Sequence, residues 1–317
     1  MDTTLQLGGL HHVTAITGSA GENVRFYTRT LGLRLVKKTV NQDDTSAYHL
    51  YYADAVGSPG TDMTFFDWPA LPAARPGSDS ISRTWFRVAD EGSLDFWGDR
   101  LRNAGARDIE RVTVAGRTAL AFVDFEGQRL GLVDHGGSPV EGEPHAVEDI
   151  PAEHRLRGFF AVELVVADRS EVDPILTSLL AMEYGGGEGS AASPHVYRMA
   201  GGGAGREVWI RVEPDTARAR QGRGAVHHVA FRVADEAEQH RWEERLNSVG
   251  VPHSGRIERF YFKSVYFRIS GGILFELATD GPGFATDEDM EHLGETLSLP
   301  PFLEPQRARI EAGLTPI

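Results

Sequence analysis

The sequence has 317 residues, which is too long for one small core and suits two domains or several smaller modules. Apolar residues make up 41% and charged residues 25%, as in globular proteins, and the net charge of −14 disfavours nucleic acid and anionic lipid surfaces as partners. The lack of cysteine excludes disulfides, thiolate zinc sites and iron–sulfur clusters, so a metal must use nitrogen and oxygen ligands.

The first residues, Met1 to Leu10, carry neither the basic start nor the apolar stretch of a secretory signal. No apolar run in the sequence approaches the roughly 20 residues that a membrane-spanning helix requires. We therefore expect a cytoplasmic protein that neither crosses a membrane nor binds nucleic acid.

The first predicted unit covers about residues 8–70. A strand is expected from His11 to Ile16, and the apolar residues between Val24 and Leu31 recur at helical spacing. Two further strands are expected at His49 to Tyr52 and at Met63 to Phe66. The unit therefore begins with a strand and a helix and continues with about three strands.

The same pattern recurs three times. The segment Phe86-Arg-Val-Ala-Asp-Glu91 returns as Phe231-Arg-Val-Ala-Asp-Glu236, and each copy ends a strand-like run and opens a helix-like one. A less similar copy is Val165-Val-Ala-Asp168. The later units cover about residues 81–136, 156–213 and 224–280.

Two joints rich in proline and glycine, Pro69 to Gly77 and Gly136 to Pro151, separate neighbouring units. We predict an N-terminal domain at 1–150, a C-terminal domain at 151–280 and a tail at 281–317. The tail contains a candidate short helix and could cover either the active site or an interface.

This organisation resembles the vicinal oxygen chelate superfamily, which includes glyoxalase I, bleomycin-resistance proteins and extradiol dioxygenases. Three runs carry the resemblance, which extends over nearly the whole chain: Leu10-His-His-Val13, Val226-His-His-Val229 and Gly271-Gly-Ile-Leu-Phe-Glu-Leu277. The resemblance implies an α+β fold in which four βαβββ modules form two glyoxalase-like half-barrel domains around a metal.

Comparing the four units position by position indicates which of them keep metal ligands. The position of His228 in the fourth unit is held in the first, second and third units by His12, Arg83 and Ala161. Near the end of the units, the position of Glu276 is held by Thr64, Gly131 and Trp209. The first and fourth units thus supply two imidazoles and one carboxylate, the set by which non-heme Fe(II) enzymes leave positions open for O2 and substrate.

Strand alternation favours His228 over His227 as the ligand, because His227 shares its face with Val229 and Phe231, which are suited to packing. By the same argument Glu276 points away from the packing face. Alternation does not decide between His11 and His12, and there we rely on the comparison of units. This parity predicts that His11 and His227 face away from the metal.

Within the superfamily, the runs at the start of the first and fourth modules and the run Phe275-Glu-Leu-Ala-Thr-Asp-Gly-Pro-Gly283 look like the hydroquinone ring-cleaving dioxygenases. That resemblance implies Fe(II), with Mn(II) as the alternative metal, and O2 and a small aromatic diol as substrates. It also nominates residues around the metal, and we expect a homo-oligomer. The nominated residues are His11, Thr14, His227, Arg259 and Tyr266.

Two other functions stay open at this point. A glyoxalase-like isomerase or lyase would use Ni or Zn without O2, but Thr64 stands where its fourth protein ligand would be. A binding protein of the bleomycin-resistance type would need no metal. His49 is isolated in the sequence and is interpreted as a surface or structural residue.

Overall fold

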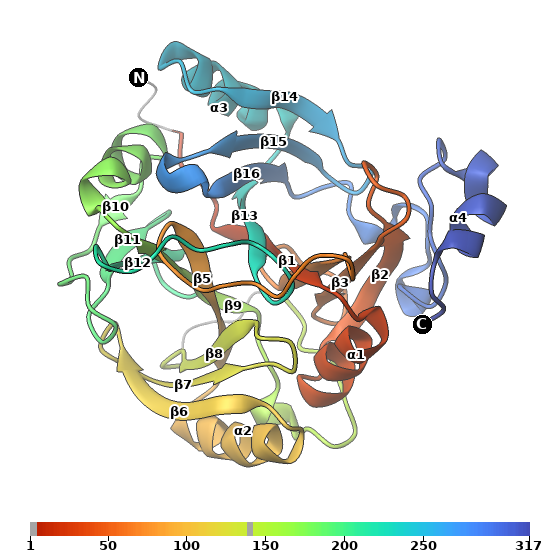
Figure 1. Ribbon diagram of the computed structural model, residues 1–317, viewed down its shortest axis with the longest axis horizontal. Helices are drawn as coiled ribbons and strands as arrows, with labels where there is room; N and C mark the ends of the chain where they lie inside the picture. Colours follow the sequence, from red (N-terminus) through yellow and green to blue (C-terminus); the bar gives the residue numbers. More distant parts are fainter. Residues whose placement is uncertain (1–4, 138–141) are drawn as a thin grey trace.

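The computed structural model describes residues 5–137 and 142–317 and shows four successive units of similar architecture (Figure 1). Each unit contributes four strands to one of two eight-stranded sheets. The predicted α+β fold and the fourfold repeat are therefore confirmed, with units that run over residues 10–67, 80–134, 159–212 and 226–279.

The first sheet joins the first and fourth units, in the order β14-β15-β16-β13-β1-β4-β3-β2. Its two central strands, β1 and β13, pair antiparallel, and each also pairs in parallel with the last strand of its own unit. The strands are β1 (Leu10–Thr17), β2 (Arg34–Val40), β3 (Tyr48–Ala53), β4 (Asp62–Asp67), β13 (Val226–Val233), β14 (His253–Glu258), β15 (Lys263–Arg268) and β16 (Leu274–Thr279).

The second sheet joins the second and third units in the same way, in the order β10-β11-β12-β9-β5-β8-β7-β6. Its central strands β5 and β9 pair antiparallel, as β1 and β13 do. The strands are β5 (Ser80–Val88), β6 (Arg107–Val114), β7 (Arg117–Val123), β8 (Arg129–Asp134), β9 (Phe159–Val166), β10 (Glu183–Tyr184), β11 (His195–Arg198) and β12 (Glu207–Val212).

This pairing differs from the grouping that the sequence predicted. The predicted domains 1–150 and 151–280 each supply half of both sheets, because the outer units of the chain pair with each other and the inner units do likewise. The domain boundary at residue 150 stays a prediction, and residues 138–141 of the joint before it lie outside the described residues. The first and fourth units meet within one chain.

Helices follow the first strand of each unit. The Asp that ends each Phe-Arg-Val-Ala-Asp segment caps a helix: Asp90 accepts from the backbone N–H of Ser93 and Asp235 from that of Glu238, both at 2.8 Å. The helices are α1 (Ala20–Val24) with a π-helical continuation (Arg25–Thr30), α2 (Glu91–Asn103), a π-helical segment (Ile175–Leu179), α3 (Glu236–Ser248) and α4 (Arg307–Gly313). No described helix has both the length and the apolar character needed to cross a membrane.

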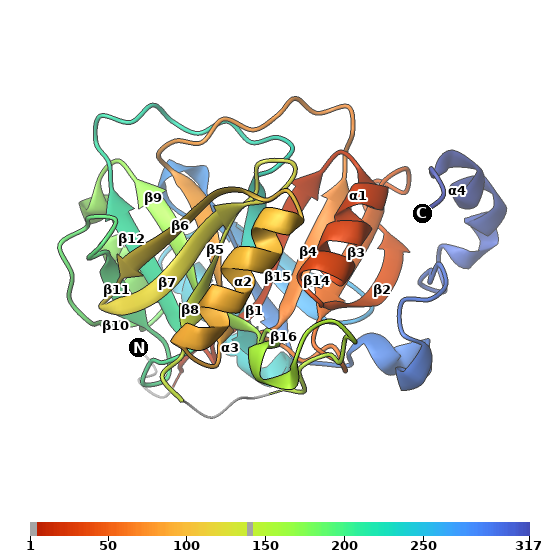
Figure 2. The same ribbon diagram turned by 90° about the horizontal axis from the view of Figure 1, so that it is seen from below.

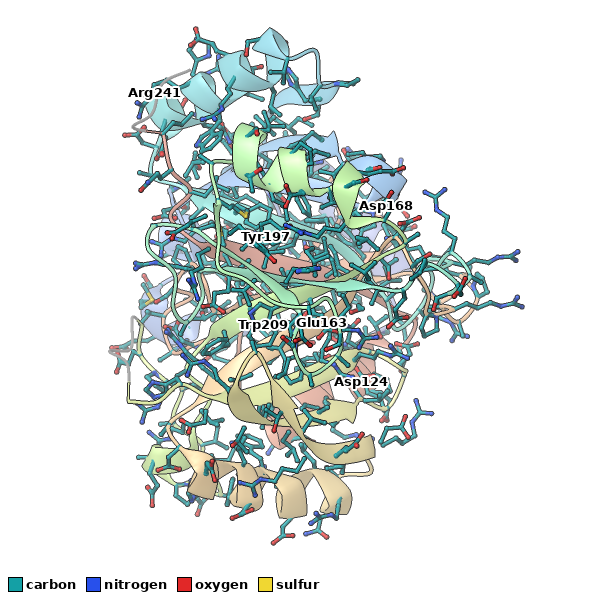
Figure 3. All side chains as sticks on the ribbon, turned by 90° about the vertical axis from the view of Figure 1, so that its left-hand side faces the viewer. Asp124, Glu163, Asp168, Tyr197, Trp209 and Arg241 are labelled. Carbon is teal, nitrogen blue, oxygen red and sulfur yellow. The ribbon has the colours of Figure 1, made fainter. Side chains whose placement is uncertain are left out.

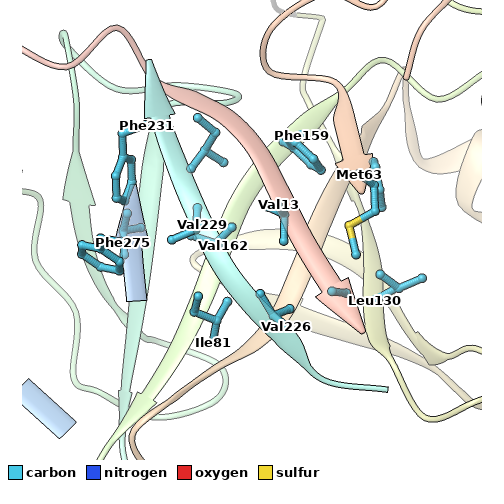
Figure 4. Close-up of a cluster of buried hydrophobic side chains, with 14 of the residues drawn as sticks. Val13, Met63, Ile81, Leu130, Phe159, Val162, Val226, Val229, Phe231 and Phe275 are labelled. Carbon is cyan, nitrogen blue, oxygen red and sulfur yellow. The ribbon is translucent and has the colours of Figure 1, made fainter. Parts of the chain in front are cut away.

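The main core lies between the two sheets and under the helices. Val13 and Val229 of the first sheet lie close to Phe159 and Val162 of the second sheet in this core (Figure 4). Helices α1 and α2 lie on one outer side, and the linkers before β5 and β13 run together over another (Figure 2). Alternate residues of β1 and β13 therefore point away from the main core, toward the inside of the first half-barrel.

Candidate metal centre

Three buried side chains converge on one point inside the first half-barrel. Nε2 of His12 lies 3.1 Å and Nε2 of His228 lies 2.9 Å from Oε2 of Glu276, and the two Nε2 atoms are 3.3 Å apart. They sit on neighbouring strands, because β1 pairs with β13 and β13 pairs with β16. The three ligand atoms all lie within 4.8 Å of one another.

The environment of Glu276 fits a bound cation. Its Oε1 accepts a hydrogen bond from the Ser264 hydroxyl, whereas its fully buried Oε2 has no hydrogen-bond partner among the described residues. Burial acts to raise the pKa of Glu276, but the two imidazoles hold it well below its usual range, so the carboxylate is ionised. A buried carboxylate oxygen that aims at two imidazole nitrogens without a hydrogen bond is suited to a divalent metal.

The neighbouring histidines do not face away, and the strand-parity prediction for them was wrong. The register of β1 and β13 shifts at both His11 and His227, so each is the extra residue of a β-bulge. Nδ1 of His11 lies 2.9 Å from Nδ1 of His12, and Nδ1 of His227 lies 2.8 Å from Nδ1 of His228. Each ligand is therefore supported by its predecessor in the sequence.

The hydrogen bonds of His11 define which nitrogen of His12 is free. Nε2 of His11 lies 3.1 Å from the Thr279 carbonyl oxygen, which can only accept, so this nitrogen donates. Burial and the neighbouring His12 lower the pKa of His11 to about 3, so the ring is neutral and its Nδ1 accepts from Nδ1 of His12. Because His11 holds the Nδ1 proton of His12, any proton on Nε2 is the one that a metal would displace, which leaves Nε2 as the ligating nitrogen.

The strand pairing reproduces the comparison of the four units. Thr64 lies opposite Thr14, Gly131 opposite Trp85, Trp209 opposite Glu163, and Glu276 opposite Ala230. In the second half-barrel this interior is filled by aromatic side chains, since the rings of Trp85 and Trp209 are 5.6 Å apart and Trp209 donates to Glu207 at 2.8 Å. Figure 3 shows Trp209 beside Glu163 on that sheet.

A second polar chain, built around His49, approaches the centre. The Thr64 hydroxyl donates to the Thr14 hydroxyl at 2.9 Å, so it accepts from Nε2 of His49, also at 2.9 Å. Nδ1 of His49 then accepts from the Tyr51 hydroxyl at 2.8 Å. Burial, and next the charges of His12 and His228, lower the pKa of His49 well below its usual value.

His49 is not isolated in the structure, because it is hydrogen-bonded to Thr64 and Tyr51, and a role for it at the centre is a proposal. Its sequence neighbours gave no signal for this role. The only hint in the sequence was the comparison that placed Thr64 beside the ligands, since Thr64 is the residue to which His49 is bonded.

Arg259 and Tyr266 form a pair on the other side of His228. The Tyr266 ring lies edge-on to the His228 ring at 5.7 Å, and the Arg259 guanidinium stands 5.4 Å over the Tyr266 ring. Nη2 of Arg259 also donates to Asp43 at 2.8 Å. Burial, and next the Glu276 carboxylate, raise the pKa of Tyr266, so its hydroxyl stays protonated. The structure thus gathers every nominated residue around the three ligands, and their roles remain predictions.

Aromatic residues lie around the site and at the start of the tail. The Phe262 ring lies 5.0 Å from that of His12, and the rings of Phe66 and Trp68 lie 5.5 and 5.8 Å from that of His227. Phe284, in the segment after β16, packs edge-on against Tyr51, with ring centroids 5.1 Å apart. This segment therefore contacts the half-barrel, and a role for the tail over the active site or at an interface stays a prediction.

Known proteins resemble this chain over its full length. A protein of Bacillus subtilis named as a ring-cleaving dioxygenase, MhqA, is 43% identical, over 99% of this chain and 100% of its own. The chlorohydroquinone/hydroquinone 1,2-dioxygenase of Sphingobium indicum is 32% identical, over 93% and 92% of the two chains.

Solved structures agree. A crystal structure of a protein from Bacillus subtilis titled as a dioxygenase superposes with a TM-score of 0.91 at 35% identity, over 98% of both chains. Glyoxalase I from Zea mays shares the fold, with a TM-score of 0.61 at 13% identity over 86% of this chain and 92% of its own. The profile of one superfamily matches residues 9–141. The chain therefore belongs to the Glyoxalase/Bleomycin resistance protein/Dioxygenase superfamily and groups within it with the ring-cleaving dioxygenases.

Proposed function

We propose that this protein is an Fe(II)-dependent dioxygenase that opens the ring of hydroquinone-type aromatic diols with O2. The carrying observation is the set of His12, His228 and Glu276 with a threonine, Thr64, at the fourth equivalent position. Three protein ligands leave coordination positions for substrate and O2, whereas a fourth carboxylate would favour the metal-dependent isomerase. Mn(II) is the alternative metal.

When bound, Fe(II) at these ligands would supply Lewis acidity toward a phenol oxygen and the one-electron chemistry that O2 requires. Arg259 and Tyr266 can stabilise negative charge that develops beside His228, one as a cation and the other as a hydroxyl donor. The chain from Tyr51 through His49 and Thr64 to Thr14 can move a proton toward the substrate.

The aromatic residues around the site and the names of related proteins support the proposed substrate class. Phe66, Trp68 and Phe262 offer aromatic surface around the ligands, which suits a flat ring. The relative at 32% identity is named for chlorohydroquinone and hydroquinone, which supports a diol with para hydroxyls over a catechol. A cytoplasmic location and a homo-oligomeric state stay predictions.

The test is O2 uptake by protein loaded anaerobically with Fe(II), measured across hydroquinones and catechols. We expect O2 consumption with hydroquinones, equal molar amounts of O2 and diol consumed, and both atoms of labelled O2 in the ring-opened product. Glu276→Gln should abolish uptake and metal retention. The matched control is Glu110→Gln, an exposed carboxylate on β6 of the other sheet, which should leave both unchanged.

Two results would contradict the proposal. The first is an absence of O2 uptake with any aromatic diol although Fe(II) is bound in a one-to-one ratio. The second is turnover of a thiohemiacetal by the Ni or Zn form without O2, which would identify an isomerase.

A further inference from the structure

A pocket of about 200 Å³ lies where the two long linkers run together, and it reaches His227, the neighbour of the candidate ligand His228. Its walls are the linker residues 74–82 and 218–227 and the turns at 127–129 and 271–274. The two linkers are fixed to each other, because the backbone N–H groups of Arg75 and Arg220 each donate to the other residue's carbonyl at 2.9 Å. The pocket is therefore part of the fold and not a gap between mobile loops.

The charge of this pocket is opposite to that of the protein. Five arginines and a single carboxylate, Asp79, line it, although the chain carries a net charge of −14. Two of the arginines are held by turn carbonyls: Arg268 donates to Gly272 at 2.6 Å and Arg218 donates to Gly271. The lining arginines are Arg75, Arg129, Arg218, Arg220 and Arg268.

Two of the remaining arginines lack a counter-charge. Within residues 5–137 and 142–317, no carboxylate forms an ion pair with Arg75 or Arg220, whereas Arg129 is close enough to Glu213 to lower the pKa of that carboxyl. Arg75 and Arg220 stand directly opposite each other in an antiparallel bridge, an arrangement in which like charges repel. An anion between them would remove this repulsion and accept hydrogen bonds from both guanidinium groups.

The rest of the lining favours an organic anion over an inorganic one. Apolar groups such as Ile81, Val226 and Leu274 face the same space, and a carbon skeleton would bury against them. We propose that this arginine-lined pocket is a binding site for a small organic carboxylate, separate from the three candidate metal ligands, none of which lines it.

The test is calorimetric titration of the metal-loaded protein, at low ionic strength, with adipate, inorganic phosphate and the uncharged 1,6-hexanediol. We expect adipate to saturate one site per chain, with phosphate binding at least about fivefold more weakly and hexanediol not binding. Combined replacement Arg75→Gln with Arg220→Gln should weaken adipate at least about tenfold. Both side chains are exposed and unpaired, so the fold should be unaffected.

The matched control replaces two exposed arginines elsewhere, Arg25→Gln with Arg102→Gln, which changes the net charge equally. Its adipate affinity should equal that of the original protein. Equal weakening in both double variants would overturn the proposal, because it would show only a general charge effect. So would the absence of a saturable adipate site, or phosphate binding as tightly as adipate.

Discussion

Each proposed metal-ligand histidine is preceded by a histidine whose Nδ1 lies within 2.9 Å of its own Nδ1. For His12 this partner also fixes the tautomer, since His11 is anchored to the Thr279 carbonyl. We expect His11→Phe to weaken Fe(II) or Mn(II) binding by about 10- to 100-fold, because His12 loses the acceptor that holds its proton on Nδ1. Competition with a coloured chelator measures the affinity.

The control for this variant is His240→Phe, at an exposed position on α3. Its metal affinity should stay at the original value. If His11→Phe also bound metal normally while remaining folded, the hydrogen bond from His12 to His11 would have no part in preparing the ligand.

Asp62 is a second buried residue near the centre, and its pKa leads to a prediction of how folding stability depends on pH. Its side chain is 1% exposed, and neither carboxylate oxygen has a hydrogen-bond partner among the described residues. Burial raises the pKa of Asp62 to about 8. The folded protein thus keeps this proton while the unfolded chain releases it near pH 4, so folding stability falls as pH rises from about 4 to about 8.

Asp62→Asn removes this ionisation and keeps the shape of the protonated acid. We expect the metal-free variant to be more stable than the metal-free original at pH 8, by on the order of 5 kcal/mol, and equally stable at pH 4 or below. Thermal unfolding at both pH values measures the difference, with the exposed Asp99→Asn as control. A stability gain that is the same at both pH values would contradict a shifted pKa.

At the scale of strands, the alternation of polar and apolar residues predicted which side chains face the core. It did not predict the β-bulges that interrupt the alternation. Val229, Phe231 and Phe275 pack in the main core while Ala230 faces the half-barrel, as the apolar pattern predicts. The bulge at His11 is a shift in hydrogen-bond register. The pattern of polar and apolar residues in the sequence does not reveal such a shift. The second sheet has register shifts at the equivalent places, Ser82 and Phe160, so the bulges belong to the module and not to the metal.

The contacts between Lys37 and the start of the tail lead to a further prediction. Lys37 is completely buried on β2, and its ammonium lies 2.6 Å from Asp287 and also contacts Glu288, both in the segment after β16. Tyr261 donates to the same Asp287 at 2.9 Å. Lys37→Met would leave two partly exposed carboxylates without their cation, which should cost less than the about 3–5 kcal/mol of a fully buried pair.

We expect Lys37→Met to detach the segment from the half-barrel, which limited proteolysis with mass spectrometry would detect as faster cleavage after residue 281. The neighbouring Lys38→Met is the matched control, since that lysine only reaches a carbonyl of Glu295 at 3.3 Å. Cleavage at the original rate in Lys37→Met would show that the ion pairs of Lys37 are not what holds the segment.

At the scale of the whole molecule, the two half-barrels fill equivalent interiors by different means. The second half-barrel holds Trp85 and Trp209, whose rings complete an apolar cluster. The first half-barrel holds three proposed ligands that come from opposite ends of the chain, residue 12 and residues 228 and 276. A bound metal would therefore link the first and fourth units, whereas the second and third units are joined by side-chain packing.

This difference predicts where a metal contributes to stability. Mn(II) at about 100 times its dissociation constant should raise the free energy of unfolding by about 2.7 kcal/mol in the original protein and by almost nothing in Glu276→Gln. Trp209→Ala should lower stability by about 3–5 kcal/mol with and without metal, because its cavity lies in the other half-barrel. Thermal unfolding of each protein, with added Mn(II) and with a chelator, separates the two effects. If Glu276→Gln gained as much from Mn(II) as the original protein, the stabilising ion would be bound elsewhere, and the link between the first and fourth units would depend on their sheet pairing alone.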